Sequence, residues 1–246
     1  MADLREVETI KNPEVQKVPA VLVLDRSASM SDRGKINQLN NALSHFKEDC
    51  MQDQRLVESV EIAIVSFGED VKKEQSFISL EDLTVPLLLA GGDTPMAEAL
   101  TMAMDLVEER KKAYKDNDVS YFRPIIFLIT DGLPTDMSNK PDACEELKRE
   151  FNRIKEEIRT GVLGCHFYFQ PVGVEPADMD FLKELCPRAE ELKERKIPVI
   201  RPIKLDEGKW IELFDFLRNS MLDVREGRNF GERSTEELGQ RYGDGD

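Results

Sequence analysis

The chain has 246 residues, of which 49 are acidic and 34 are basic, so its formal net charge is −15. Nucleic acids and anionic membranes bind basic surfaces, and we therefore expect neither as a partner. No apolar stretch reaches the ~20 residues of a membrane span. Residues 1–17 lack the apolar segment of a signal peptide, and the four cysteines do not have the spacing of a zinc site. We expect a cytoplasmic protein.

Two kinds of apolar pattern alternate along the chain. Continuous runs rich in β-branched residues predict strands buried on both faces, and apolar residues three or four positions apart predict helices. In chain order these are strand 20–24, helix 36–46, strand 60–67, a short edge strand 77–80, helix 96–109, strand 124–129, helix 144–158, strand 163–172, a short helix 180–185, a brief strand 199–200 and helix 210–221. The alternation predicts an α/β fold, with a doubly wound, mostly parallel sheet and helices on both faces.

Three polar segments follow predicted strands or precede a predicted helix. They span residues 25–30, 91–95 and 130–136. Each has an ordinary structural explanation when taken alone. The serines of the first segment could bond loop amides or cap a helix, Thr94-Pro95 could start a helix, and Asp131-Gly132 is a common turn.

Taken together, the three segments offer two carboxylates and three hydroxyls: Asp25, Ser27, Ser29, Thr94 and Asp131. Ligands of parallel α/β sheets bind at the carboxyl ends of the strands, where these residues should meet. A set made only of oxygens favours Mg²⁺ or Mn²⁺ over Zn²⁺. Two carboxylates roughly balance a divalent charge, so the ion could accept one more anionic oxygen from outside.

The order and spacing of these five residues resemble the metal-ion-dependent adhesion site of von Willebrand factor A (VWA) domains. The resemblance covers residues 18–222 and is nearest to the stand-alone bacterial branch typified by TerY proteins, on segments 29–40, 58–68 and 128–136. It implies that Ser27, Ser29 and Thr94 bind the metal directly, and that Asp25 and Asp131 bind it directly or through water.

The resemblance also implies a function and a domain organisation. The chain would be a metal-dependent protein–protein interaction module and not an enzyme, in a stress, tellurite-resistance or phage-defence system. An acidic side chain of a protein partner would complete the coordination, with a kinase or phosphatase encoded nearby as candidate partner. Residues 1–17 would be an extension, and residues 223–246, with five glycines among charged residues, a flexible polar tail.

Two positions depart from the family pattern. Ala28 stands where the family usually has glycine, and it is tolerated if its φ is negative. The bulky Arg26 lies between Asp25 and Ser27, where it could favour a carboxylate partner or simply be solvated.

Two other functions stay open at this point. A Mg²⁺-dependent phosphoryl-transfer enzyme could use Asp25 as its nucleophile, but such enzymes usually have a second acid two residues later, where this chain has Ser27. Signatures of serine hydrolases and of nucleotide-binding P-loops are absent. Alternatively, the chain could keep the fold with an inactive metal site and act as a metal-free scaffold.

Overall fold

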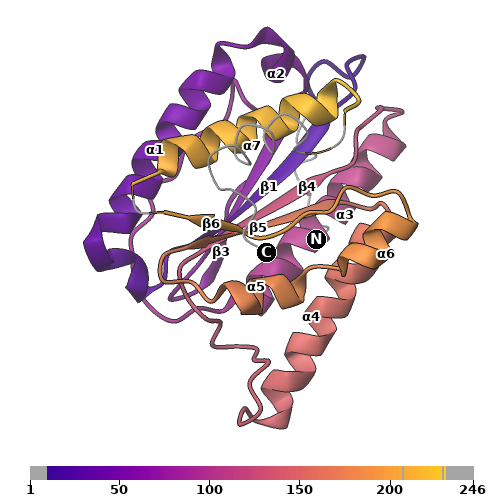
Figure 1. Ribbon diagram of the computed structural model, residues 1–246. Coiled ribbons are helices and arrows are strands. Elements are labelled where there is room, and N and C mark those ends of the chain that lie inside the picture. Colours follow the sequence, from indigo (N-terminus) through magenta and orange to yellow (C-terminus); the bar gives the residue numbers. More distant parts are fainter. Residues whose placement is uncertain (1–9, 207, 229, 231–246) are drawn as a thin grey trace, which may run out of the picture.

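The computed structural model describes residues 10–206, 208–228 and 230. A six-stranded sheet forms its centre, with the strand order β3-β2-β1-β4-β5-β6 (Figure 1). The strands are β1 (Val18–Asp25), β2 (Val60–Phe67), β3 (Val71–Ser79), β4 (Ile125–Thr130), β5 (Tyr168–Val174) and β6 (Ile203–Leu205). Only β3 runs antiparallel to its neighbour among these strands. The predicted Rossmann-like, doubly wound α/β class is confirmed.

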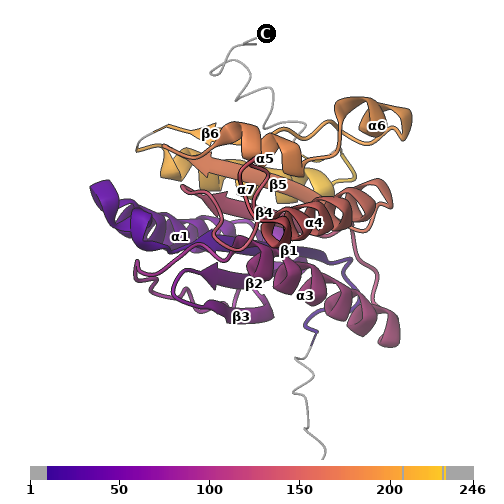
Figure 2. The same ribbon diagram turned by 90° about the horizontal axis from the view of Figure 1, so that it is seen from below.

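Helices cover both faces of the sheet (Figures 1 and 2). The core on one face includes residues of α1 (Lys35–Met51), α2 (Gln54–Ser59) and α7 (Trp210–Arg225). The core on the other face includes residues of α3 (Met96–Asp116), α4 (Glu145–Leu163), α5 (Met179–Leu185) and α6 (Ala189–Glu194). A short 3-10 helix, η1 (Ala28–Gly34), links β1 to α1.

Strand β1 lies between β2 and β4, and all eight of its residues are buried. Leu22 and Leu24 belong to the core beneath α1 and α7, whereas Val21 and Val23 belong to the core beneath α3 and α4. Successive side chains of a strand point to opposite faces, so a strand covered on both sides must be apolar throughout. This requirement is why the continuous apolar run predicts the strand.

The prediction of a strand over 163–172 is wrong at its start. Leu163 ends α4, and β5 begins only at Tyr168. The apolar stripe of α4 continues through Ile158 and Val162, which are both buried, so the helix has a reason to extend this far. It stops where Cys165 adopts a left-handed conformation, with φ of 58°.

Both edge strands differ from their predicted positions. The last strand is β6 rather than 199–200, and it pairs with β5 through Ile203 opposite Val172. Prolines at 198 and 202 flank the predicted segment and lack the N–H that a ladder needs. Strand β3 starts at Val71 instead of 77. The sequence does not reveal its first half, because this half is partly exposed and its charged residues give no apolar pattern.

Near the chain ends, the described residues are tied to the domain more closely than the sequence indicates. Lys17 is buried, and its ammonium donates to the Glu58 carbonyl at 2.8 Å. At the other end α7 continues to Arg225, so residues 223–225 belong to this helix rather than to the predicted tail. Phe230 stacks on Tyr168, with ring centroids 5.1 Å apart. Residues 1–9, 229 and 231–246 of the predicted extension and tail lie outside the described residues.

Candidate metal-binding site

The candidate site lies at the carboxyl edge of the sheet, beside the neighbouring strands β1 and β4. The chain passes from β1 to β2 on one side and reaches β4 on the other, so the strand order reverses between β1 and β4. Loops diverge at such a switch point and leave room for a ligand. Asp25 is the last residue of β1, and Asp131 directly follows β4.

Asp25 is fully buried, and neighbouring groups fix both of its oxygens. Its Oδ1 accepts a hydrogen bond from the Ser27 amide at 2.8 Å, and its Oδ2 accepts one from the Thr130 hydroxyl at 2.6 Å. Burial raises the pKa of Asp25, and the hydrogen bonds from Ser27 and Thr130 act in the opposite direction. The carboxylate is therefore held in one orientation at the base of the site.

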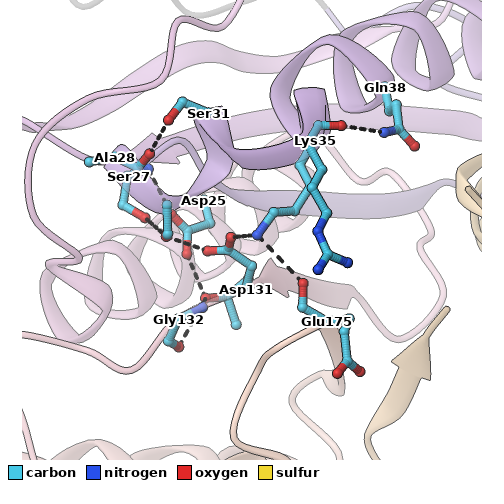
Figure 3. A network of polar contacts seen from close by, with 12 residues as sticks. Asp25, Ser27, Ala28, Ser31, Lys35, Gln38, Asp131, Gly132 and Glu175 are labelled. Carbon is cyan, nitrogen blue, oxygen red and sulfur yellow. Dashed lines mark hydrogen bonds and ion pairs between the residues drawn. The ribbon is translucent and has the colours of Figure 1, made fainter. Parts of the chain in front are cut away.

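A chain of short oxygen–oxygen contacts continues from this loop to Asp131 (Figure 3). The hydroxyls of Ser27 and Ser29 are 3.1 Å apart, and the Ser29 hydroxyl donates to Asp131 Oδ1 at 2.6 Å. Adjacent ligands of an octahedral Mg²⁺ ion, with bonds of about 2.1 Å, are about 3 Å apart. The spacing of these oxygens therefore fits the ligand set of a small, hard cation.

Thr94 comes to the same place on a separate loop. The Gly91 amide donates to the Arg26 carbonyl at 2.8 Å, and the Ala28 amide donates to the Gly92 carbonyl at 3.0 Å. These bonds fasten the loop to the one that follows β1. A Cβ at Gly132 would be 3.7 Å from the Ser29 hydroxyl and 3.8 Å from the Thr94 hydroxyl, so both hydroxyls face this glycine.

The helix-capping explanation of Thr94 does not hold. Helix α3 begins at Met96, and its N-cap residue is Pro95. The carboxylate of Asp136 binds the first free amides instead, at 3.0 Å from both Ala97 N and Glu98 N. Asp136 was predicted only as part of a polar segment, and this capping role was missed. The Thr94 hydroxyl is thus left for another use.

The two departures from the family pattern have simple structural outcomes. Ala28 is not among the described residues with positive φ, so alanine fits there without left-handed strain. Arg26 is neither solvated nor directed to the site. Its guanidinium donates to the Ser66 hydroxyl at 3.1 Å and forms an ion pair with Asp70 at the β2–β3 turn.

A lysine that the sequence analysis did not assign to the site also reaches it. Lys35 is the first residue of α1 and is only 7% exposed. Its ammonium forms an ion pair with Asp131 Oδ2 and lies 3.5 Å from the Glu175 carbonyl (Figure 3). The sequence offered a modest signal, because a helix that starts soon after a site loop presents its first side chains to that loop.

The donor set agrees with a hard cation and not with a zinc-type centre. Within the described residues, no three His, Cys, Asp or Glu side chains gather in a way that could hold a metal ion. The site has two carboxylates, and its other oxygens are hydroxyls. Mg²⁺ and Mn²⁺ accept such oxygens, whereas Zn²⁺ is usually held by nitrogen and sulfur.

Two exposed leucines lie on the segment that leads to Thr94. Leu87 is 78% exposed and Leu89 is 71% exposed, whereas Leu88 between them is buried. The Asn40 side chain holds this segment through both the amide and the carbonyl of Leu88, each at 2.9 Å. In an extended chain the N–H and C=O of one residue point to the same side, and the side chains of its two neighbours point away from that residue's own, so Leu87 and Leu89 are held outward.

Comparison with known proteins agrees with this architecture. Residues 20–133 match the family model described as the von Willebrand factor type A domain, and this segment contains all five candidate ligands. The fold is that of a VWA domain. No curated protein matches the sequence.

Several solved structures resemble the chain in fold at low sequence identity. The vWF domain of the type V pili tip protein Mfa5 from Porphyromonas gingivalis is 12% identical, with a TM-score of 0.59 over 85% of this chain and 97% of that one. The conserved hypothetical protein BatB from Bacteroides thetaiotaomicron is 13% identical, with a TM-score of 0.51 over 85% and 99%.

The open conformation of the pilus adhesin SpaC from Lactobacillus rhamnosus GG is 12% identical, with a TM-score of 0.59. The alignment covers 87% of this chain but only 30% of SpaC, so the fold described here corresponds to a part of that larger adhesin.

Proposed function

We propose that this VWA protein is a metal-dependent protein–protein interaction module. Asp25, Ser27, Ser29, Thr94 and Asp131 would hold Mg²⁺ or Mn²⁺, and a protein partner would supply an aspartate or glutamate carboxylate to the ion. One observation carries the proposal: three separate loops bring two carboxylates and three hydroxyls together at the switch point of the sheet.

The surroundings of the site support a protein as the ligand. Leu87 and Leu89 place exposed apolar surface on the segment leading to Thr94. Exposed leucines suit contact with a protein surface, which can cover apolar side chains that water does not favour. VWA domains are in general protein-interaction modules, and the pilus tip protein and adhesin among the similar structures carry the same fold.

The geometry of Asp25 argues against the phosphoryl-transfer alternative. A nucleophilic carboxylate must present an oxygen to its substrate. Asp25 is fully buried at the base of the site, where a phosphoryl group of a substrate has no access to its oxygens. The residue two positions later is a serine that cannot serve as the second acid. We therefore propose binding rather than catalysis.

The cellular setting is a part of the proposal that rests on sequence resemblance. The TerY-like segments at 29–40, 58–68 and 128–136 point to a cytoplasmic stress, tellurite-resistance or phage-defence system. A kinase or phosphatase encoded nearby is then the candidate partner. In the part of the chain that the structure describes, no helix is long and apolar enough to cross a membrane.

Calorimetric titration with MgCl₂, MnCl₂ and ZnCl₂ tests the metal. We expect Mg²⁺ and Mn²⁺ to bind the wild type and not Ser27→Ala, which loses a hydroxyl ligand without gaining charge. Ser31→Ala is the matched control, because the Ser31 hydroxyl lies in the same loop but donates to the Ala28 carbonyl at 2.7 Å. Tight Zn²⁺ binding without a response to Mg²⁺ or Mn²⁺ would contradict the proposal.

Affinity capture tests the partner. Proteins retained from lysate in the presence of Mg²⁺ should be lost with a chelator or with Thr94→Ala, whereas moderate salt should have little effect on a short, partly desolvated contact. The same partners captured with and without chelator would favour the metal-free scaffold.

A further inference from the structure

We propose that Lys35 is a built-in cation that competes with the metal for Asp131 and, once displaced, strengthens the binding of a partner carboxylate. This inference rests on the proposed function, and it assigns to Lys35 a part in setting the affinities for the metal ion and for the partner carboxylate. It concerns a residue outside the five that the sequence pattern identifies.

The contacts of Asp131 show why Lys35 and a metal ion would compete for it. Its Oδ1 accepts a hydrogen bond from the Ser29 hydroxyl, and its Oδ2 forms the ion pair with Lys35. The ammonium therefore neutralises the carboxylate whose Oδ1 joins the Ser27–Ser29 hydroxyl chain. A metal ion bound at Oδ1 is repelled by this like charge across the carboxylate, and one that uses Oδ2 must take it from the ammonium. The side chain of Asp131 is fully buried and that of Lys35 is 9% exposed, so water and salt screen this pair only weakly.

The backbone explains why Lys35 is brought to the site. Arg33 and Gly34 both have positive φ, 51° and 69°, which turns the chain sharply from η1 into α1. The turn buries the first residue of α1 against the loop that follows β4, although a helix N-terminus does not favour a cation. Lys35 therefore stands where its own helix dipole opposes it, and Asp131 provides the compensating charge.

A displaced ammonium has another place close by. A small pocket beside the site is lined by Lys35 and Glu175 together with Arg33, Gln38 and Trp210, and the acceptor that it offers an ammonium is the Glu175 carbonyl. The Glu175 carbonyl is already 3.5 Å from the ammonium. The four-carbon stem of a lysine is flexible, so its head can move toward Glu175 while the residue keeps its place in the helix.

Formal charges show the consequence for the partner. With the carboxylates of Asp25 and Asp131 ionised and Lys35 protonated, the summed formal charge of these three groups is −1. A bound divalent ion raises this sum to +1. A partner carboxylate then neutralises the site. Without the lysine the same steps run from −2 through zero to −1, which favours the metal and disfavours the carboxylate. Arg26 does not replace this charge, because it pairs with Asp70.

Calorimetry on Lys35→Met tests the inference, since methionine keeps an unbranched side chain without the charge. We expect its Kd for Mn²⁺ to be at least tenfold lower than that of the wild type. Acetate, titrated into the Mn²⁺-loaded proteins as the carboxylate probe, should bind at least threefold more weakly to Lys35→Met. Lys35→Arg keeps the charge and should stay close to the wild type for both ligands.

Lys47→Met is the matched control. Lys47 lies on the same helix, and its ammonium donates to the Leu83 carbonyl at 2.5 Å, away from the site. This variant should bind Mn²⁺ like the wild type. Circular dichroism of each variant with and without chelator confirms that the fold is kept.

The possible results separate the inference from the proposed function. Equal or weaker Mn²⁺ binding by a folded Lys35→Met, with normal binding by the wild type, would overturn the role of Lys35 and leave the metal site in place. Binding by Lys35→Met alone would be the strongest support. Failure of both proteins to bind Mn²⁺ or Mg²⁺ would overturn the inference and the proposed function together.

Discussion

At the amino edge of the sheet, Glu61 at the start of β2 is buried against Arg110 and Tyr114. Its Oε2 accepts hydrogen bonds from Arg110 Nε at 2.8 Å and from the Tyr114 hydroxyl, and it pairs with a second Arg110 nitrogen at 2.7 Å. At the carboxyl edge, Asp25 and Asp131 are equally buried, and the ammonium of Lys35 pairs with Asp131.

The two edges differ in their charge balance: the Glu61–Arg110 pair at the amino edge is neutral and stabilises the fold, whereas the carboxyl edge keeps an excess negative charge that suits a bound cation. Glu61 and Arg110 balance each other, and because Arg110 belongs to α3, the pair fastens this helix to the sheet. The carboxyl edge has one more negative charge than positive, and it carries hydroxyls that do not cap a helix. An excess of buried negative charge costs stability, which a bound cation would recover.

The largest expected effect is at the amino edge. Glu61→Gln removes the charge opposite a buried Arg110 and should lower the free energy of unfolding by about 3 kcal/mol, as expected when a buried ion pair loses one member. Urea denaturation measures the loss. The stabilisation by added Mg²⁺ should equal that of the wild type, and a change in it would show that the two edges are coupled.

Thr94→Ala should have the complementary effect at the carboxyl edge. At a Mg²⁺ concentration of about 100 times Kd, the wild type should gain about 2.7 kcal/mol, because the ion binds only the folded state. The variant should lose this gain and keep the metal-free stability, since Thr94 does not cap α3. Thermal melts with and without chelator measure both. A wild-type-like response to metal would exclude Thr94 as a ligand.

Tyr114→Phe should cost about 1.5 kcal/mol, the value typical of a hydrogen bond to a charged group. Burial and the neighbouring Glu61 raise the pKa of Tyr114 above its ordinary value of 10. Above pH 10 the unfolded tyrosine ionises while the folded one keeps its proton, so stability falls as pH rises. The wild type should therefore lose more stability than Tyr114→Phe between pH 9 and 11. If the free energy of unfolding fell equally with pH in both proteins, the raised pKa of Tyr114 would be contradicted.

The smallest effect is expected for Ala28→Gly, which restores the residue usual in the family. Because the φ of Ala28 is not positive, glycine gains nothing in the folded state and makes the unfolded chain more flexible. The variant should lose about 0.5 kcal/mol in denaturant titrations, with an unchanged response to Mg²⁺. A stabilised variant would show that Ala28 strains the loop.

Residues with local or periodic signals could be predicted from the sequence. The apolar runs of β1, β2 and β4 predicted buried strands, and the parallel arrangement followed from the alternation with helices. Since parallel strands end at one edge, the positions of Asp25 and Asp131 predicted that the two carboxylates would meet there. Asp25, Ser27, Ser29, Thr94 and Asp131 lie together as that argument requires, and their role as metal ligands stays a prediction.

Other features depended on contacts between distant segments. The position of β6 depends on its pairing with β5, and the start of β3 depends on its pairing with β2, where Val71 lies opposite Phe67. The direction of the Arg26 side chain depends on its ion pair with Asp70. The ion pair of Lys35 joins residues 96 positions apart. Periodicity reports only which face of an element is covered. Which charges meet at the end of a sheet depends on the packing of whole elements, and only the tertiary structure decides it.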